Sequence, residues 1–172
     1  MIKSTQKIIT AILFQCGWWI NIGAAVYKLQ IAATVLTLII IGSYLFFLCP
    51  KNSRLKELMI ISIVGAYGLL GDSLLNYLEV FKFVVKSDFI PMWLLMIWLL
   101  FAMTSGLYEY LKNNQKLAFI LGAIFGPLSY AAGLKFSLLT FPMDWVSIAI
   151  LAMVWGCNFP ALLYLRKRIY TV

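Results

Sequence analysis

The chain contains no histidine, and it is poor in charged residues. Its 172 residues include 14 Lys or Arg and 6 Asp or Glu, together 12% of the sequence, about half of the roughly one quarter typical of soluble domains. The lack of histidine removes the commonest general base and a common metal ligand. The three cysteines form no C-x-x-C pair, so no zinc site or disulfide framework is indicated. We therefore expect neither a metal nor a cofactor.

Apolar residues dominate what remains. Hydrophobic residues make up 63% of the sequence, and the mean hydropathy is +0.95. A membrane-spanning helix needs about 20 predominantly apolar residues, and six segments reach that length: 8–27, 29–48, 57–80, 90–111, 117–136 and 144–165. The sequence predicts an all-α integral membrane bundle of six transmembrane helices, forming a single domain over residues 1–172.

The basic residues are unevenly distributed between the two ends of these segments. Ten Lys or Arg lie at the chain termini and in the second and fourth loops, and four lie in the other loops. Cytoplasmic loops carry an excess of Lys and Arg, so both termini are predicted to be cytoplasmic. The net charge of +8 lies in short clusters between apolar segments. We interpret it as a determinant of topology and expect no nucleic-acid partner.

The third apolar segment carries a polar face. Gly65, Gly68, Asp72, Asn76 and Glu79 fall on one side of a helix at 100° per residue. A carboxylate in bilayer hydrocarbon costs at least about 2.5 kcal/mol, so Asp72 should face protein or water. It could accept a proton, bind a cationic group or act as a general acid. Equally, it could be a hydrogen-bonding node that ties helices together.

Several polar and aromatic residues of other segments share the depth of this carboxylate. Counting 1.5 Å per residue along each segment, we expect a pocket slightly outside the midplane. Asp72 would be its central polar group. The residues that reach this depth are Gln15, Trp18, Asp72, Trp98, Ser129 and Tyr130, with Asn76 beside them. Among these, the two tryptophans would form the apolar walls, and the polar side chains would be hydrogen-bonding neighbours of the carboxylate.

Small residues and tryptophans elsewhere suggest packing and interfacial contacts. Gly122-x-x-x-Gly126 in the fifth segment would let another helix approach closely. Trp93 and Trp145 lie near segment ends, as expected of an interfacial aromatic belt.

Two of the carboxylates lie near the ends of apolar segments and have a nearby lysine. Glu79 and Glu109 each have a lysine three residues further on, Lys82 and Lys112. Side chains three residues apart are neighbours on a helix surface, so we expect two local ion pairs.

Four short sequence motifs are distributed along nearly the whole chain. These are F-Q-C-G-W at 14–18, D-S-L-L at 72–75, P-M-W-L-L at 91–95 and G-P-L-S-Y at 126–130. Together they resemble a bacterial family of small inner-membrane proteins classed as a domain of unknown function. The resemblance implies a multi-pass protein of the bacterial inner membrane. It also implies an association with membrane lipid metabolism through enzymes that modify fatty acyl chains, such as cyclopropane-fatty-acid-type methyltransferases.

Three functional hypotheses remain open at this point. The first is that the polar pocket binds or handles a lipid or another small amphipathic molecule. The second is a proton-coupled transporter of small solutes, in which Asp72 carries the proton. The third is an accessory subunit that positions a lipid-modifying enzyme. No nucleophile–base pair or phosphate-binding loop supports an enzyme. Membrane lipids, a lipid-modifying enzyme and further copies of the chain are the partners considered.

Overall fold

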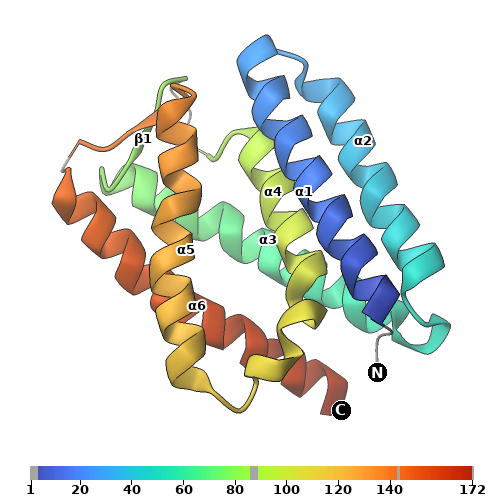
Figure 1. The fold of residues 1–172 in the computed structure, drawn as a ribbon. Coiled ribbons are helices and arrows are strands. Elements are labelled where there is room, and N and C mark those ends of the chain that lie inside the picture. Colours follow the sequence, from blue (N-terminus) through green and yellow to red (C-terminus); the bar gives the residue numbers. More distant parts are fainter. Residues whose placement is uncertain (1–3, 86–88, 143, 172) are drawn as a thin grey trace.

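The computed structural model describes residues 4–85, 89–142 and 144–171. The fold is all-α, and the described residues contain six helices that are long and apolar enough to cross a membrane (Figure 1). This confirms the predicted architecture. Each helix satisfies its own backbone hydrogen bonds, as a chain segment surrounded by lipid must. The helices are α1 (Ser4–Tyr27), α2 (Gln30–Ser43), α3 (Arg54–Tyr77), α4 (Met92–Met103), α5 (Gln115–Lys135) and α6 (Trp145–Thr171).

Two of the spans are completed by non-α turns. A π-helical stretch, Tyr44–Leu48, extends α2, and a 3₁₀-helix, Thr104–Leu111, extends α4. A short 3₁₀ turn, Lys51–Ser53, precedes α3. The sequence-based end of the sixth segment at Leu165 is wrong, because α6 continues to Thr171. The basic residues assigned to a tail therefore belong to a helix, and one of them is buried in the protein.

The helices form two groups that meet at α3. In the first group, α1 and α2 lie side by side and both contact α4, and α4 contacts α3. In the second group, α5 lies against α6, and α6 contacts α3 and the 3₁₀ extension of α4. In Figure 1, α3 and α6 cross the bundle obliquely, and both chain ends lie at the same end. We call this the terminal end. Which end faces the cytoplasm stays a prediction.

The opposite end is covered by a short two-stranded sheet. Strand β1 (Lys82–Phe83) pairs antiparallel with β2 (Leu139–Thr140). The Asn76 amide oxygen accepts a hydrogen bond from the backbone N–H of Phe83 at 3.3 Å, so this part of the polar face of α3 holds the strand. Trp93 lies beneath it, with its ring 6.3 Å from that of Phe83 and only 6% of its surface exposed. Its predicted place in an interfacial belt is therefore wrong.

Surface features agree with a bundle immersed in an apolar solvent. Large hydrophobic side chains such as Ile31 and Phe47 are exposed, where they would contact lipid chains. The two local ion pairs are confirmed: Glu79 Oε1 lies 2.8 Å from Lys82 Nζ, and Glu109 Oε1 lies 3.4 Å from Lys112 Nζ.

Candidate functional site

Two stacked tryptophans join the halves of the bundle. The rings of Trp98 on α4 and Trp155 on α6 are nearly parallel, with an interplanar angle of 15° and centroids 4.9 Å apart. A Cβ added to Gly68 would lie 2.2 Å from the Trp98 ring, and one added to Gly126 would lie 2.2 Å from the Trp155 ring. Both glycines are therefore needed for the indoles to fit. The backbone of α6 also lies against Gly122, which confirms the predicted close approach to α5.

Asp72 lies one helical turn beyond Gly68 and binds two aromatic side chains. The Trp98 Nε1–H donates to Asp72 Oδ2 at 2.7 Å, and the Tyr130 hydroxyl donates to Asp72 Oδ1 at 2.6 Å. The carboxylate is almost completely buried, with 2% of its surface exposed. Since the donors come from α4 and α5, Asp72 connects three helices.

The aromatic packing continues toward the sheet end. The Phe81 ring lies 5.1 Å from the Tyr130 ring and is fully buried. This side chain belongs to the segment that leads into β1, so the sheet covers the Asp72 node from that end. Ser73, next to the carboxylate, accepts a hydrogen bond from the Ile90 N–H at 3.1 Å and anchors the start of the next segment. It takes no part in a catalytic triad.

A cavity of about 600 Å³ lies beside this node. Its walls come from α1, α4 and α5, with contributions from α6 and from the 3₁₀ extension of α4. Most lining side chains are aromatic or aliphatic: Phe14, Gln15, Trp18, Leu94, Ile97, Trp98, Phe101, Tyr108, Tyr110, Leu121, Gly122, Phe125, Gly126, Leu128, Ser129, Tyr130, Ala132, Trp155 and Phe159. The exposed ones include Phe125 and Leu128 on α5, so large apolar side chains border the open side of the cavity.

The sequence-predicted site residues separate into two layers around this cavity. Gln15, Trp18, Trp98, Ser129 and Tyr130 all line it. Asp72 lies behind Trp98 and Tyr130 and does not line the cavity itself. Its hydrogen bonds come from these two side chains, whereas Gln15 and Ser129 reach the cavity from α1 and α5. The Ser129 hydroxyl donates to the Gly126 carbonyl at 2.6 Å.

No metal centre is suggested by the described residues, among which no group of three or more His, Cys, Asp or Glu could hold an ion. The phenol and indole donors around Asp72 are likewise not metal ligands of the common kinds. The site can therefore offer apolar volume, a few hydrogen-bonding groups and one nearby carboxylate.

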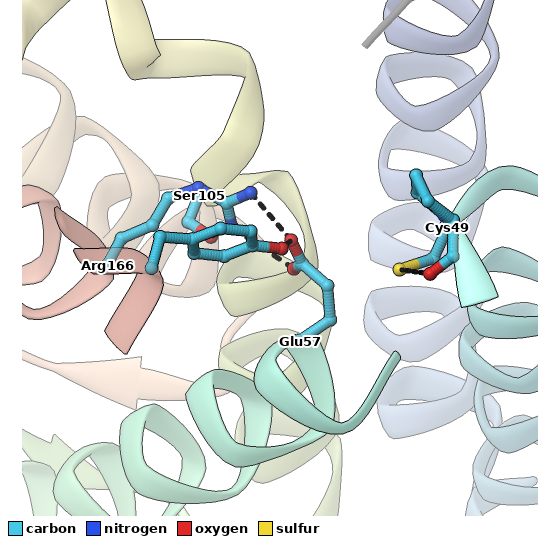
Figure 2. A network of polar contacts seen from close by, with 6 residues as sticks. Cys49, Glu57, Ser105 and Arg166 are labelled. Atoms are coloured by element: carbon cyan, nitrogen blue, oxygen red, sulfur yellow. Dashed lines mark hydrogen bonds and ion pairs between the residues drawn. The ribbon is translucent and has the colours of Figure 1, made fainter. Parts of the chain in front are cut away.

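A second buried polar network lies near the terminal end, and sequence reasoning missed it. Glu57 on α3 and Arg166 on α6 form a bidentate pair, with N–O distances of 2.6 and 3.1 Å (Figure 2). The Arg166 guanidinium also donates to Ser105 Oγ at 2.9 Å, and the Tyr170 hydroxyl donates to Glu57 Oε1 at 2.5 Å. Glu57 is 1% exposed and Arg166 9% exposed. This network joins α3, α6 and the extension of α4.

The sequence did carry a signal for this pair. Glu57 shares a helix face with the buried Ile60, Ile61 and Val64, and a charged residue within such an apolar stripe indicates a buried partner. Counting Arg166 as part of a cytoplasmic tail hid the partner.

Cys49 lies close to this network, between the π-helical end of α2 and the turn before α3. Burial raises the pKa of the Cys49 thiol to about 11, and the negative charge of Glu57 contributes to the rise. The thiol donates to the Pro50 carbonyl at 3.6 Å, and Figure 2 shows it across from Glu57. We interpret Cys49 as a buried, unreactive side chain.

Comparisons with known proteins place the chain in a family. No curated protein and no solved structure matches it. The family described as "Protein of unknown function (DUF2878)" matches residues 7–161. That match includes five of the six spans in full or nearly so, and it covers every residue of the Asp72 node and of the cavity wall. The chain is therefore a multi-pass membrane protein that belongs to this family of unknown function.

Proposed function

We propose that the protein binds one amphipathic lipid-like molecule in the cavity between α1, α4 and α5. The observation that carries this proposal is an apolar cavity of about 600 Å³ whose open side is bordered by exposed apolar side chains of a bundle of apolar, membrane-length helices. Small-molecule sites are typically concave, mostly apolar and about 300–1,000 Å³ in volume. An opening toward lipid admits molecules already dissolved in the bilayer.

The stretch of α5 that lines the cavity is long enough to contact a hydrocarbon chain. Its lining on α5 extends from Leu121 to Ala132, which corresponds to roughly 16 Å at 1.5 Å per residue. That is about half of the ~30 Å hydrocarbon core, the depth occupied by the chains of one leaflet. Near the sheet end, the Trp19 and Phe136 rings lie 6.1 Å apart and bridge α1 and α5. A hydrocarbon chain would therefore enter between α1 and α5, on the side of this bridge that faces the terminal end.

Polar groups in the wall would orient such a ligand. Gln15 and Ser129 carry exposed side chains on opposite walls of the opening. The amide can donate and accept hydrogen bonds, and the serine oxygen still has acceptor capacity while its hydrogen is used by the helix backbone. These groups would bind the polar part of an amphiphile, while the aromatic side chains contact its chain.

Two adjacent alanines on α5 allow a matched test. Ala132 lines the cavity, whereas Ala131 is exposed on the outer surface of the same helix. The purified protein would be exchanged through detergent, and retained lipids would be quantified by mass spectrometry. We expect about one retained molecule per chain for the native protein and for Ala131→Phe, and its loss in Ala132→Phe. Equal retention by both variants would refute binding in this cavity.

The two alternatives from sequence make different predictions for Asp72. A proton-coupled transporter would lose flux in Asp72→Asn, and its flux would depend on the proton gradient. An accessory subunit would lose folding or association with its enzyme partner instead. We propose lipid binding first because the cavity supports it directly, with the bacterial inner membrane as the expected location.

A further inference from the structure

The cavity wall is unusually rich in aromatic side chains and carries no charge. Ten of its nineteen lining residues are Phe, Tyr or Trp, and none is Lys, Arg, Asp or Glu. Aromatic rings present negative faces to which cations are attracted, most strongly where water is excluded. A wall of this kind tolerates a cation better than it tolerates an anion.

The buried carboxyl of Asp72 lies behind this wall, in contact with two of its aromatic residues. Each of its two oxygens accepts a hydrogen bond from a different donor, Trp98 at 2.7 Å and Tyr130 at 2.6 Å. An indole N–H can only donate, and hydrogen bonds to a carboxylate favour its ionised form. None of the ion pairs in the described part of the chain involves Asp72. A negative charge on Asp72 would therefore have no counter-charge among those ion pairs.

We propose that the ligand supplies that counter-charge, as a quaternary ammonium or protonated amine attached to an apolar chain. This inference rests on the proposed function and names the class of head group. The cation would lie in the cavity against Trp98 and Tyr130, one side chain away from the carboxylate. Coulomb attraction between charges is stronger where water is excluded from the space between them. By accepting hydrogen bonds from both rings, Asp72 also polarises them toward the cavity.

The test compares head groups on one chain. Four amphiphiles share a brominated 16-carbon chain and end in trimethylammonium, phosphocholine, hydroxyl or sulfate. They are titrated into protein-containing nanodiscs of digalactosyldiacylglycerol, an uncharged lipid without an ammonium group, and quenching of tryptophan fluorescence is measured against mole fraction in the disc. In Ala132→Phe the added phenyl ring fills the cavity, so this variant gives the quenching caused by amphiphile in the surrounding lipid alone. Asp72→Asn removes the charge and keeps the side-chain shape.

We expect the trimethylammonium amphiphile to bind the native protein about tenfold or more tightly than the hydroxyl and sulfate amphiphiles. Asp72→Asn should lower the affinity for the trimethylammonium amphiphile to that for the hydroxyl amphiphile, so that the preference is lost. Equal binding of all four head groups would overturn the cation inference and leave amphiphile binding intact. No cavity-dependent quenching by any of them would overturn the proposed function as well. The head-group comparison needs no variant at position 72, so it decides the matter even if Asp72→Asn fails to fold.

Discussion

The buried pair between Glu57 and Arg166 makes a sharp prediction about stability. Replacing Glu57 with methionine leaves a guanidinium that is 11% exposed in its side chain, with one hydrogen bond to Ser105 remaining. Removing one partner of a buried pair costs about 3–5 kcal/mol because the other charge stays uncompensated. We expect a loss of about 3 kcal/mol for Glu57→Met, since the long arginine side chain lies in the last turns of α6 and can turn toward the membrane–water interface.

The double-mutant cycle separates the pair from general packing effects. Arg166→Met leaves the carboxylate of Glu57 with the Tyr170 hydroxyl as a donor, and it should cost a similar ~3 kcal/mol. The double variant should lie within about 2 kcal/mol of the native protein, because a methionine pair fills the space without buried charge. The coupling energy would then be at least about 2 kcal/mol.

The assay is unfolding by sodium dodecyl sulfate in mixed micelles, followed by circular dichroism. An exposed pair in the same protein provides the control. Glu109 and Lys112 are 3.4 Å apart, with about half of each side chain exposed, so Glu109→Gln should change stability by less than ~0.5 kcal/mol. Additive single effects at Glu57 and Arg166, or a Glu57→Met variant as stable as the control, would refute the reasoning.

Three further outcomes are expected. Gly68→Ala should destabilise by about 1–3 kcal/mol in the same unfolding assay, because its methyl group would lie 2.2 Å from the Trp98 indole ring. Gly71→Ala is the control: the nearest atoms to an added methyl group are 3.9 Å away, so this variant should be neutral or slightly stabilising. Tyr130→Phe should cost about 1–3 kcal/mol, since one oxygen of Asp72 loses its donor; an unchanged unfolding midpoint would contradict this. The third prediction concerns Cys49, with the other two cysteines replaced by alanine. A thiol with a pKa of about 11 is roughly 0.1% thiolate at pH 8, and this fraction rises about tenfold per pH unit below the pKa. Alkylation of Cys49 by N-ethylmaleimide should therefore accelerate about tenfold per pH unit between pH 7.5 and 9.5. A rate independent of pH would contradict that prediction.

The tertiary structure changed how several sequence patterns are interpreted. Shared depth correctly indicated that Trp98 and Tyr130 are close to Asp72, because only residues at similar depth in neighbouring spans can meet. It could not distinguish side chains that bind the carboxylate from side chains that line the cavity beside it. Trp93 was misplaced because an indole near a segment end suits an interface equally well, and the strand that covers it comes from a loop with no strong sequence signal.

The sequence alone determined the number of the membrane spans and their approximate positions. Each helix satisfies its own backbone hydrogen bonds in lipid, so a run of about 20 apolar residues suffices to define it. Only the tertiary structure decided which helices are neighbours. The Asp72 node requires α3, α4 and α5 to meet, and the Glu57–Arg166 pair joins residues 109 positions apart. Those contacts depend on side-chain packing between helices whose lipid-facing and protein-facing sides are both apolar, so hydropathy does not reveal them.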